Sequence, residues 1–272
     1  MHPFHKAGFQ RIFGTWPLQG QAAEKATLAA LETGYRAIDT AQFYQNETAV
    51  GRALKAAALP RDSLCITTKV MPGNYSSDRF RPSVEQSLAD LGLDSVDILL
   101  LHWPPPDGNL FQCLEWLQDM QTRGLARRIG VSNFTISLLK ETCAFLDVPL
   151  ATNQIEFHPF LDQSRLMQHA TKHRIQLSAY CALDRGVACT DPDLAAIGQR
   201  YGKTAAKVTL RWILQKGIIP ISMSSRPARI RVNFAIEDFT LTHIDMDMID
   251  RRCDRNLRIV NSEKVPHAPP WD

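Results

Sequence analysis

Short apolar runs alternate along the chain with longer amphipathic runs. Eight short runs have the length and composition of buried strands. They span residues 10–13, 37–39, 64–70, 96–101, 129–131, 152–156, 176–180 and 218–221. Amphipathic runs with apolar residues near helical spacing lie between them, at residues 21–33, 46–57, 82–91, 110–123, 136–145, 164–173 and 204–215. Gly34 follows the first of these, and glycine commonly stands just beyond the end of a helix.

The repeated strand–helix order predicts the fold class. We expect an α/β protein built as a single (β/α)8 TIM barrel, with one domain over residues 1–272 and the active site at the C-terminal face of the strands. An open doubly wound sheet is the alternative. Such a sheet usually carries a G-x-G-x-x-G turn after its first strand, and this sequence has none there.

Composition and charge exclude several classes of protein. Of the 272 residues, 44% are hydrophobic and 22% are charged, which is typical of a globular chain. The 31 Lys and Arg against 28 Asp and Glu leave a net charge of +3, too small and too scattered for a nucleic-acid-binding stripe. The most apolar run, residues 96–101, is too short to cross a membrane, and residues 1–6 lack the apolar core of a signal peptide. Six dispersed cysteines without metal-ligand spacing predict reduced thiols, no metal and a cytoplasmic location.

Polar residues stand where the predicted strands end. Asp39 ends the second strand, Lys69 lies at the end of the third, and His102 directly follows the fourth; Tyr44 lies shortly after Asp39. Each has an ordinary explanation when taken alone: a turn carboxylate, a surface lysine, a structural histidine and an aromatic residue on the rim. In a barrel, however, the strand ends face one common mouth, so we expect these four side chains to meet there.

Together the four side chains can make an acid that protonates a carbonyl oxygen. A phenol has an unperturbed pKa of about 10, and a buried ammonium beside it favours the phenolate and lowers that pKa. The carboxylate of Asp39 would hold Lys69 in place and keep it charged. The imidazole of His102 could orient a substrate carbonyl through a hydrogen bond.

Four segments of the chain also match the motifs of one known family. They are Gly34-Tyr35-Arg36-Ala37-Ile38-Asp39-Thr40-Ala41 (followed by Tyr44, Asn46-Glu47 and Gly51), Leu101-His102-Trp103-Pro104, Ile129-Gly130-Val131-Ser132-Asn133-Phe134 and Asn153-Gln154-Ile155-Glu156-Phe157-His158-Pro159. On these motifs the chain resembles the aldo/keto reductase superfamily from about Phe9 to its end. Its compact length and the terminal Pro269-Pro270-Trp271-Asp272 are similar to the bacterial 2,5-diketo-D-gluconate reductases.

The resemblance implies an NADPH-dependent oxidoreductase that acts as a monomer. It would reduce aldehydes or ketones, such as keto sugar acids, methylglyoxal-like compounds or aromatic aldehydes, by hydride transfer. The implied catalytic residues are Asp39, Lys69, His102 and the general acid Tyr44. The implied cofactor-binding residues are Gly14, Thr15, Ser132, Asn133, Gln154, Tyr180, Leu183, Ser224, Arg226, Arg229 and Asn233. The implied substrate wall consists of Trp16, Phe43, His102 and Trp103, covered by residues 104–110 and the tail after Arg252.

The sequence departs from the family pattern at the expected adenosine-phosphate site. Met223 stands where a lysine is usual, and Val232 replaces a frequent acidic residue. Because arginine can bind phosphate with two hydrogen bonds, the resemblance still favours NADPH through Arg229, helped by Arg226, with NADH as a weaker alternative. Asp184 stands where glycine is common in the loop that the resemblance places beside the pyrophosphate.

Two other functions fit the same residues. One is a Schiff-base lyase in which Lys69 is the nucleophile; this requires a neutral lysine, whereas a carboxylate partner would keep Lys69 charged. The other is a cofactor-binding regulatory subunit with little turnover. The intact set of four residues argues against the second alternative.

Overall fold

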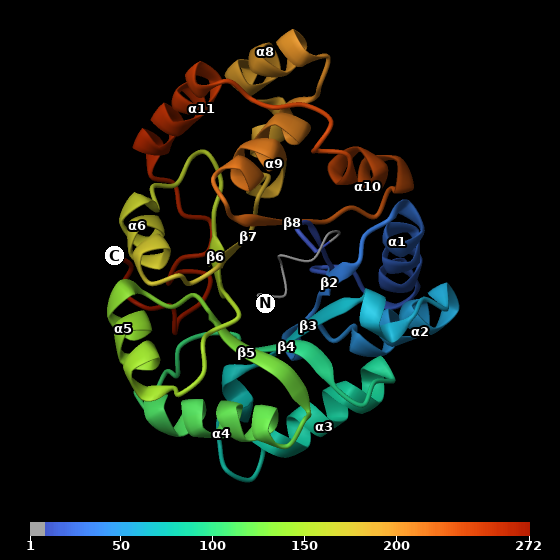
Figure 1. The fold of residues 1–272 in the computed structure, drawn as a ribbon, viewed down its shortest axis with the longest axis vertical. Coiled ribbons are helices and arrows are strands. Elements are labelled where there is room, and N and C mark those ends of the chain that lie inside the picture. The colour runs from blue at the N-terminus through green and yellow to red at the C-terminus, as the bar shows by residue number, and fades with distance from the viewer. Residues whose placement is uncertain (1–8) are drawn as a thin grey trace.

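The computed structural model describes residues 9–272; the predictions made for residues 1–6 lie outside this range. Eight parallel strands close into a barrel in chain order, with β8 beside β1 (Figure 1). They are β1 (Ile12–Gly14), β2 (Ala37–Asp39), β3 (Cys65–Val70), β4 (Val96–Leu101), β5 (Ala126–Ser132), β6 (Asn153–Glu156), β7 (Leu177–Tyr180) and β8 (Ile219–Ser222). The predicted α/β barrel is therefore confirmed.

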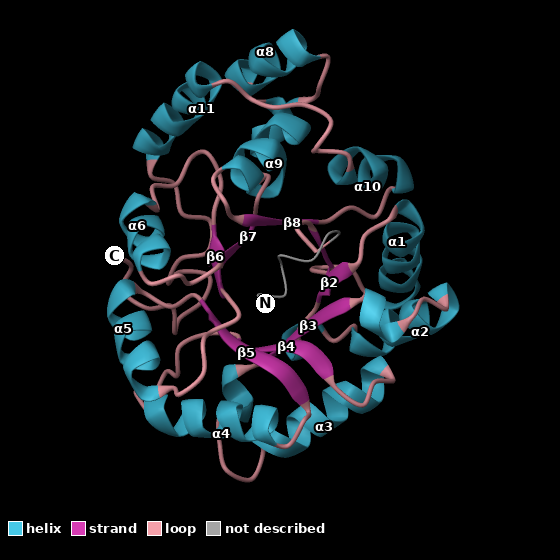
Figure 2. Ribbon diagram, in the orientation of Figure 1, coloured by secondary structure: helices cyan, strands magenta, loops and turns pink. Residues whose placement is uncertain are grey.

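Helices surround the ring of strands, as Figure 2 shows. The seven helices predicted from the sequence are present as α1 (Gly20–Thr33), α2 (Glu47–Ala57), α3 (Phe80–Leu91), α4 (Leu110–Thr122), α5 (Ile136–Phe145), α6 (Ser164–Lys172) and α9 (Ala205–Gln215). The sequence reading missed four more helices: α7 (Val187–Thr190), α8 (Pro192–Tyr201), α10 (Pro227–Phe234) and α11 (His243–Asp250). The segment after β8, which holds the expected adenosine-phosphate site, contains α10.

Short 3-10 turns complete the connections between these elements. They are η2 (Gln42–Tyr44), η3 (Arg61–Ser63), η4 (Pro72–Asn74), η5 (Asp184–Gly186) and η6 (Arg251–Arg255). Of these, η2 places Tyr44 above the end of β2, and η5 lies in the loop after β7. Residues 256–272 follow η6 without regular helix or strand.

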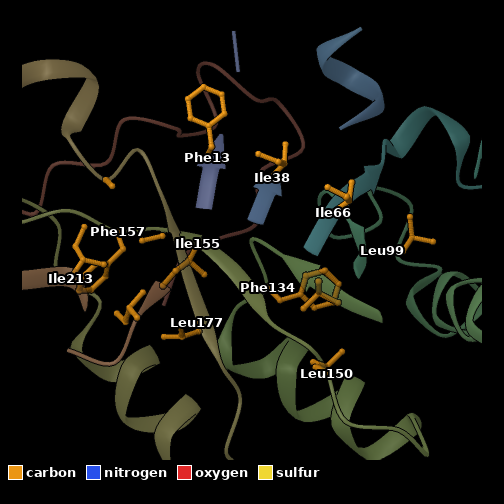
Figure 3. Close-up of a cluster of buried hydrophobic side chains, with 14 of the residues drawn as sticks. Phe13, Ile38, Ile66, Leu99, Phe134, Leu150, Ile155, Phe157, Leu177 and Ile213 are labelled. Atoms are coloured by element: carbon orange, nitrogen blue, oxygen red, sulfur yellow. The ribbon is translucent and has the colours of Figure 1, made fainter. Parts of the chain in front are cut away.

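Alternation along the strands separates two hydrophobic layers, because successive side chains of a strand point to opposite faces. Outward side chains such as Phe13, Ile38 and Ile66 pack toward the helices in the larger layer (Figure 3). Inward neighbours such as Ile12 and Ala37 form a smaller cluster inside the barrel. The same alternation then turns polar residues inward at the upper strand ends.

Strand register brings the predicted site residues to neighbouring levels. Asp39 pairs with Thr67, two residues before Lys69 on the same face of β3. Lys69 in turn pairs with Leu100, two residues before His102. This stagger from strand to strand is the shear that closes a barrel. It places all three side chains at the C-terminal mouth.

Two glycines fit places that a larger residue would disturb. Gly34 caps α1 with φ of 120°, and its N–H reaches the carbonyls of Ala30 and Leu31, as predicted from the sequence. Gly51 lies where α2 meets α3, and a Cβ there would stand 2.5 Å from the carbonyl oxygen of Asp90. The close approach of the two helices therefore depends on Gly51.

The described part of the chain contains no helix that is both long and apolar enough to cross a membrane. Within residues 9–272 there is also no group of three or more His, Cys, Asp or Glu side chains suited to hold a metal ion.

Candidate active site

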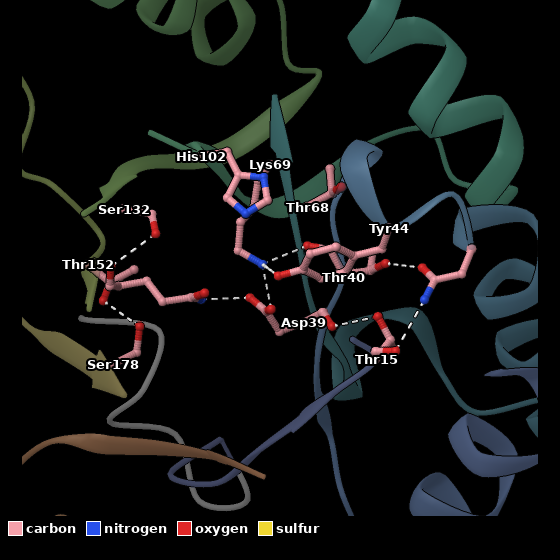
Figure 4. Close-up of polar contacts among 12 residues, drawn as sticks. Thr15, Asp39, Thr40, Tyr44, Thr68, Lys69, His102, Ser132, Thr152 and Ser178 are labelled. Carbon is pink, nitrogen blue, oxygen red and sulfur yellow. Dashed lines mark hydrogen bonds and ion pairs between the residues drawn. The ribbon is translucent and has the colours of Figure 1, made fainter. Parts of the chain in front are cut away.

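The ammonium of Lys69 lies at the centre of the mouth and is completely buried. It donates to Oδ1 of Asp39 at 2.5 Å, to the carbonyl oxygen of Thr40 at 2.9 Å and to the hydroxyl of Tyr44 at 3.1 Å (Figure 4). Three acceptors thus satisfy the three donors of one ammonium. The structure brings together the strand-end residues that the sequence singled out.

The pair of Asp39 and Lys69 is held in its charged form. The second carboxylate oxygen of Asp39 accepts a hydrogen bond of 2.7 Å from Nε2 of Gln154. Burial acts to lower the pKa of Lys69, but Asp39 and Tyr44 act in the opposite direction and the pKa is raised overall. Lys69 therefore remains an ammonium at neutral pH.

Tyr44 corrects one prediction from the sequence. Burial is the largest influence on its phenol and raises the pKa, whereas the neighbouring charge of Lys69 lowers it. The net effect is a raised pKa and not the lowered one that the ammonium alone would produce. Tyr44 is consequently protonated at neutral pH, and Lys69 limits how far its acidity is suppressed.

His102 stands beside Tyr44 as a neutral imidazole. The two rings lie 5.6 Å apart at 78°, and the ring of Phe43 lies 6.2 Å from His102. Burial, helped by the charge of Lys69, lowers the pKa of His102 well below its usual value. Nδ1 of His102 is buried and meets no hydrogen-bond partner among the described residues.

Aromatic side chains form the rim around these groups. Trp16 stacks on Phe43 with ring centres 5.7 Å apart and lies 5.2 Å from the ring of Tyr44. Trp16 and Phe43 are 45% and 56% exposed, which is unusual for large apolar side chains and places them at an open edge. Trp103 lies deeper and is buried.

A second hydrogen-bonded group joins the ends of β4, β5, β6 and β7. Asn133 adopts a left-handed φ of 65°, its Nδ2 donates to the carbonyl oxygen of His102, and its Oδ1 accepts a bond of 2.6 Å from the hydroxyl of Tyr180. Ser132 donates to the carbonyl oxygen of Gln154. The structure thus gathers four of the implied cofactor-binding residues: Ser132, Asn133, Gln154 and Tyr180.

The remaining predicted cofactor residues lie at the end of β1, in the loops after β1, β7 and β8, and in α10. Thr15 donates to the carbonyl oxygen of Asp39, and a Cβ on Gly14 would stand 2.8 Å from the side chain of Ile221. Leu183 is partly buried in the loop after β7 and packs on the outer core.

The N-terminal end of α10 carries the predicted phosphate-side residues. Ser224 is buried, and its hydroxyl oxygen accepts the N–H of Arg226, which caps the helix. Asn233 is buried, whereas Arg226 and Arg229 are exposed. The donors needed for an anion are therefore present on one short helix and its cap.

The backbone conformation of the loop after β7 explains why glycine is expected at the position of Asp184. Cys181, Asp184 and Arg185 all adopt left-handed φ values of 47–51°, and Gly186 follows at 106°. Glycine adopts this conformation most readily, which accounts for its expected place in this loop. Burial raises the pKa of the Asp184 carboxyl. The charges of His158 and Arg255 act to lower this pKa, and the charge of Glu156 acts to raise it.

The sequence reading placed the tail over the mouth but did not identify what attaches it. Residues 256–272, here called the strap, are fixed by the buried carboxylate of Glu156. Its two oxygens accept the backbone N–H groups of Ile259 at 2.6 Å and Val260 at 2.8 Å, and the ring of His158 lies 3.0 Å from it. Burial acts to raise the pKa of Glu156, but these hydrogen bonds lower it overall, so the carboxylate is ionised.

The strap also closes on the predicted substrate wall. The rings of His267 and Trp271 lie 5.6 Å and 6.2 Å from the ring of Trp103. No periodic pattern marks this segment in the sequence; the only signal for it was the terminal Pro-Pro-Trp-Asp.

A closed parallel (β/α)8 barrel with a buried lysine, an aspartate, a tyrosine and a histidine at its C-terminal mouth defines a class of barrel enzymes. The model of the aldo/keto reductase family matches residues 8–253. The chain belongs to the aldo/keto reductase family.

Individual relatives resemble the chain over nearly its whole length. The methylglyoxal reductase DkgB of Yersinia pestis is 38% identical over 262 residues, covering 95% of this chain and 97% of that protein. An aldo-keto reductase of Mycobacterium avium is 40% identical, with 87% and 83% covered. A crystal structure whose proposed identity is a 2,5-diketo-D-gluconic acid reductase B is 40% identical, with a TM-score of 0.93 and 98% and 96% covered. The Bombyx mori aldo-keto reductase in complex with NADP is 30% identical, with a TM-score of 0.86 and 93% and 92% covered.

Proposed function

We propose that the protein is an NADPH-dependent reductase of aldehydes and ketones in which Tyr44 is the general acid. The observation that carries this proposal is the buried ammonium of Lys69, shared between the carboxylate of Asp39 and the hydroxyl of Tyr44. A protonated phenol with a fixed cation beside it can release its proton as negative charge develops on a carbonyl oxygen.

Each of the four side chains has one task in this reaction. Tyr44 donates its proton to the carbonyl oxygen. Lys69 stabilises the phenolate that remains, and Asp39 keeps Lys69 charged and correctly placed. The neutral ring of His102 donates a hydrogen bond that orients the carbonyl. NADPH, when bound, supplies the hydride for the carbonyl carbon.

The residues present fit such a cofactor. Tyr180 offers a ring face, and Ser132, Asn133 and Gln154 form a polar group around it. The exposed guanidiniums of Arg226 and Arg229 at the start of α10 suit a phosphate. One domain over residues 1–272, a monomeric state and a cytoplasmic location remain predictions.

A Schiff-base lyase is disfavoured by the charge on Lys69. The first step of that reaction needs a neutral amine, yet Asp39 and Tyr44 raise the pKa of Lys69. Incubation with a carbonyl compound and borohydride, without cofactor, should leave the mass of the protein unchanged. A borohydride-trapped adduct at Lys69 would favour the lyase.

The direct test of the proposed function measures NADPH oxidation with a panel of keto sugar acids, methylglyoxal and aromatic aldehydes, repeated with NADH. We expect turnover with several of these carbonyls. Binding of NADPH with no turnover on any of them would favour the alternative of a regulatory subunit.

Replacing Lys69 by methionine should lower kcat and shift the pH–rate profile toward higher pH. The ammonium lowers the pKa of Tyr44 against the effect of burial, so its removal leaves a weaker acid. Steady-state rates over the pH range in which the variant stays folded would measure the shift. A lowered kcat with an unmoved profile would show that Lys69 does not tune the acid.

Replacing Arg229 by alanine should weaken NADPH binding about tenfold or less and leave NADH binding almost unchanged. The guanidinium is exposed, so solvent screens its interaction with a 2′-phosphate. Met223→Lys should do the reverse and strengthen NADPH binding by about 0.5–1 kcal/mol. Quenching of tryptophan fluorescence by each cofactor measures both changes. Equal losses for NADH and NADPH in Arg229→Ala would contradict the role of Arg229.

A further inference from the structure

The strap carries an arginine next to the substrate wall. The guanidinium carbon of Arg258 lies 3.9 Å from the ring centre of Trp271, whose ring lies 6.2 Å from Trp103. Trp103 directly follows His102. Arg258 is partly buried, and its cation is stacked on a ring that borders the substrate wall.

Nη1 of Arg258 is buried without an acceptor in the range 9–272, and burial and the charges of more distant groups are the influences on this guanidinium. A nearby arginine shows what a satisfied guanidinium looks like here, because Arg252 binds the carboxylates of Asp191 and Asp193. Burying a charged donor without a partner is costly, so Arg258 is poised to bind an anion.

The carboxylates that influence Arg258 are already occupied. Glu156 accepts the N–H groups of Ile259 and Val260 and contacts His158. Asp272 accepts the N–H of Ile136 at the start of α5. Burial lowers the pKa of Arg258 despite the opposite effects of Glu156, Tyr180 and Asp272. Neither carboxylate forms an ion pair with Arg258.

Other nitrogen atoms on the strap repeat this pattern. Nε1 of Trp271 and Nε2 of His267 are buried and have no partner within the described residues. Both rings pack on Trp103. The side of the mouth formed by the strap therefore carries several nitrogen atoms without acceptors, and the charge of Arg258 acts to lower the pKa of Tyr180, the neighbour of Glu156 across β6 and β7.

We infer that Arg258 is a specificity-determining residue that binds a carboxylate on the carbonyl substrate, so that anionic carbonyl compounds are reduced in preference to neutral ones of the same shape. The planar guanidinium matches a carboxylate with two parallel hydrogen bonds. Stacking on Trp271 fixes the plane of the guanidinium before the substrate arrives. The inference rests on the proposed reductase function.

The experiment compares two aromatic aldehydes that differ in charge: 4-carboxybenzaldehyde and its methyl ester. The wild type should have the larger kcat/KM for the acid. Arg258→Gln should lower kcat/KM for the acid about 10- to 100-fold, mostly through KM, which is the effect of losing charge-assisted hydrogen bonds. The kcat/KM for the ester should change by less than about twofold, because the ester has no carboxylate to bind Arg258.

Control variants distinguish recognition from structural damage. Arg251→Gln removes an exposed guanidinium from η6 and should leave kcat/KM unchanged for both the acid and the ester. Arg258→Lys retains a positive charge without the planar guanidinium. Its kcat/KM for the acid should lie between those of the wild type and Arg258→Gln, and its kcat/KM for the ester should be unchanged. Thermal unfolding of each variant checks that the fold is intact.

Three results would overturn the inference. Equal losses for acid and ester in Arg258→Gln would mean that the arginine only shapes the pocket. Weaker NADPH binding in that variant would mean that it contacts the cofactor. An unchanged preference for the acid would mean that another group recognises the charge. Reduction of neither aldehyde, nor of any carbonyl in the panel, would instead refute the reductase function itself.

Discussion

Replacing Tyr44 by phenylalanine should lower kcat for carbonyl reduction about 10²- to 10⁴-fold, the usual contribution of a positioned general acid. The phenol is the protonated group that contacts the ammonium of Lys69, and phenylalanine keeps its ring against Trp16 and His102. The variant loses the proton donor and the oxygen that accepts one hydrogen bond from Lys69. NADPH binding, measured by fluorescence quenching, should remain close to that of the wild type.

A second tyrosine provides the matched control. Tyr35 is also buried, and its hydroxyl lies 3.0 Å from Ser222, away from Lys69. Tyr35→Phe therefore removes a buried hydroxyl without touching the proposed acid, and should keep most of the activity. Retention of more than half of the wild-type kcat in Tyr44→Phe would refute the assignment of the acid.

Replacing Asp39 by leucine should lower the free energy of unfolding by about 3–5 kcal/mol. Leucine preserves the shape of the side chain but leaves the ammonium of Lys69 completely buried without its carboxylate. It also removes the acceptor of Gln154. Urea unfolding of the two proteins measures the loss, and carbonyl reduction should fall with it.

A double variant separates the cost of the orphaned charge from the cost of the substitution. Asp39→Leu combined with Lys69→Met removes both charges, and should recover most of the lost stability, because apolar replacement of a buried ion pair is often neutral. If the double variant is no more stable than Asp39→Leu, the unpaired charge is not the source of the instability.

The effect of pH on these proteins follows from the pKa of Lys69. In the wild type this pKa is raised, so the stabilisation from the pair is complete below the unfolded pKa and is lost as the pH rises through the folded pKa. Without Asp39, burial remains as the main influence and lowers the pKa of Lys69. The folded variant then favours the neutral amine, and its stability deficit should shrink at mildly alkaline pH.

The strands and the main site residues could be predicted because both depend on simple periodicity. Short apolar runs identified all eight strands, and the two-residue alternation within them turns Asp39 and Lys69 inward at their upper ends. Once the barrel is assumed, the ends of β2, β3 and β4 must face the same mouth. Neither placement required knowledge of side-chain packing.

Three of the four helices that the sequence pattern does not predict, α7, α10 and α11, have eight residues or fewer, whereas α8 has ten. The α8 helix begins with Asp191 as N-cap and Pro192 in its first turn, and ends before Gly202, which are recognisable signals. Since α9 already provides the one helix that the strand–helix repeat requires between β7 and β8, α8 is an addition to that repeat. The α10 helix has eight residues with exposed arginines, so it offers little apolar periodicity.

Two features of the site depend on tertiary packing and could not be predicted. The raised pKa of Tyr44 results mainly from burial, which a sequence does not display. The attachment of the strap joins Glu156 to backbone N–H groups about a hundred positions further along the chain. Backbone donors are the same at every position, so no residue type marks where such a contact forms.

Attachment through the backbone makes the position of the strap independent of most of its side chains. Glu156 binds amide hydrogens of Ile259 and Val260, and the bonds do not depend on which side chains those residues carry. Side chains at positions 258, 267 and 271 can therefore change while the segment stays anchored. The strap can therefore vary in sequence while Tyr44, Lys69, Asp39 and His102 stay unchanged. A library randomised at these three positions should yield enzymes with altered substrate preference and an intact proton donor.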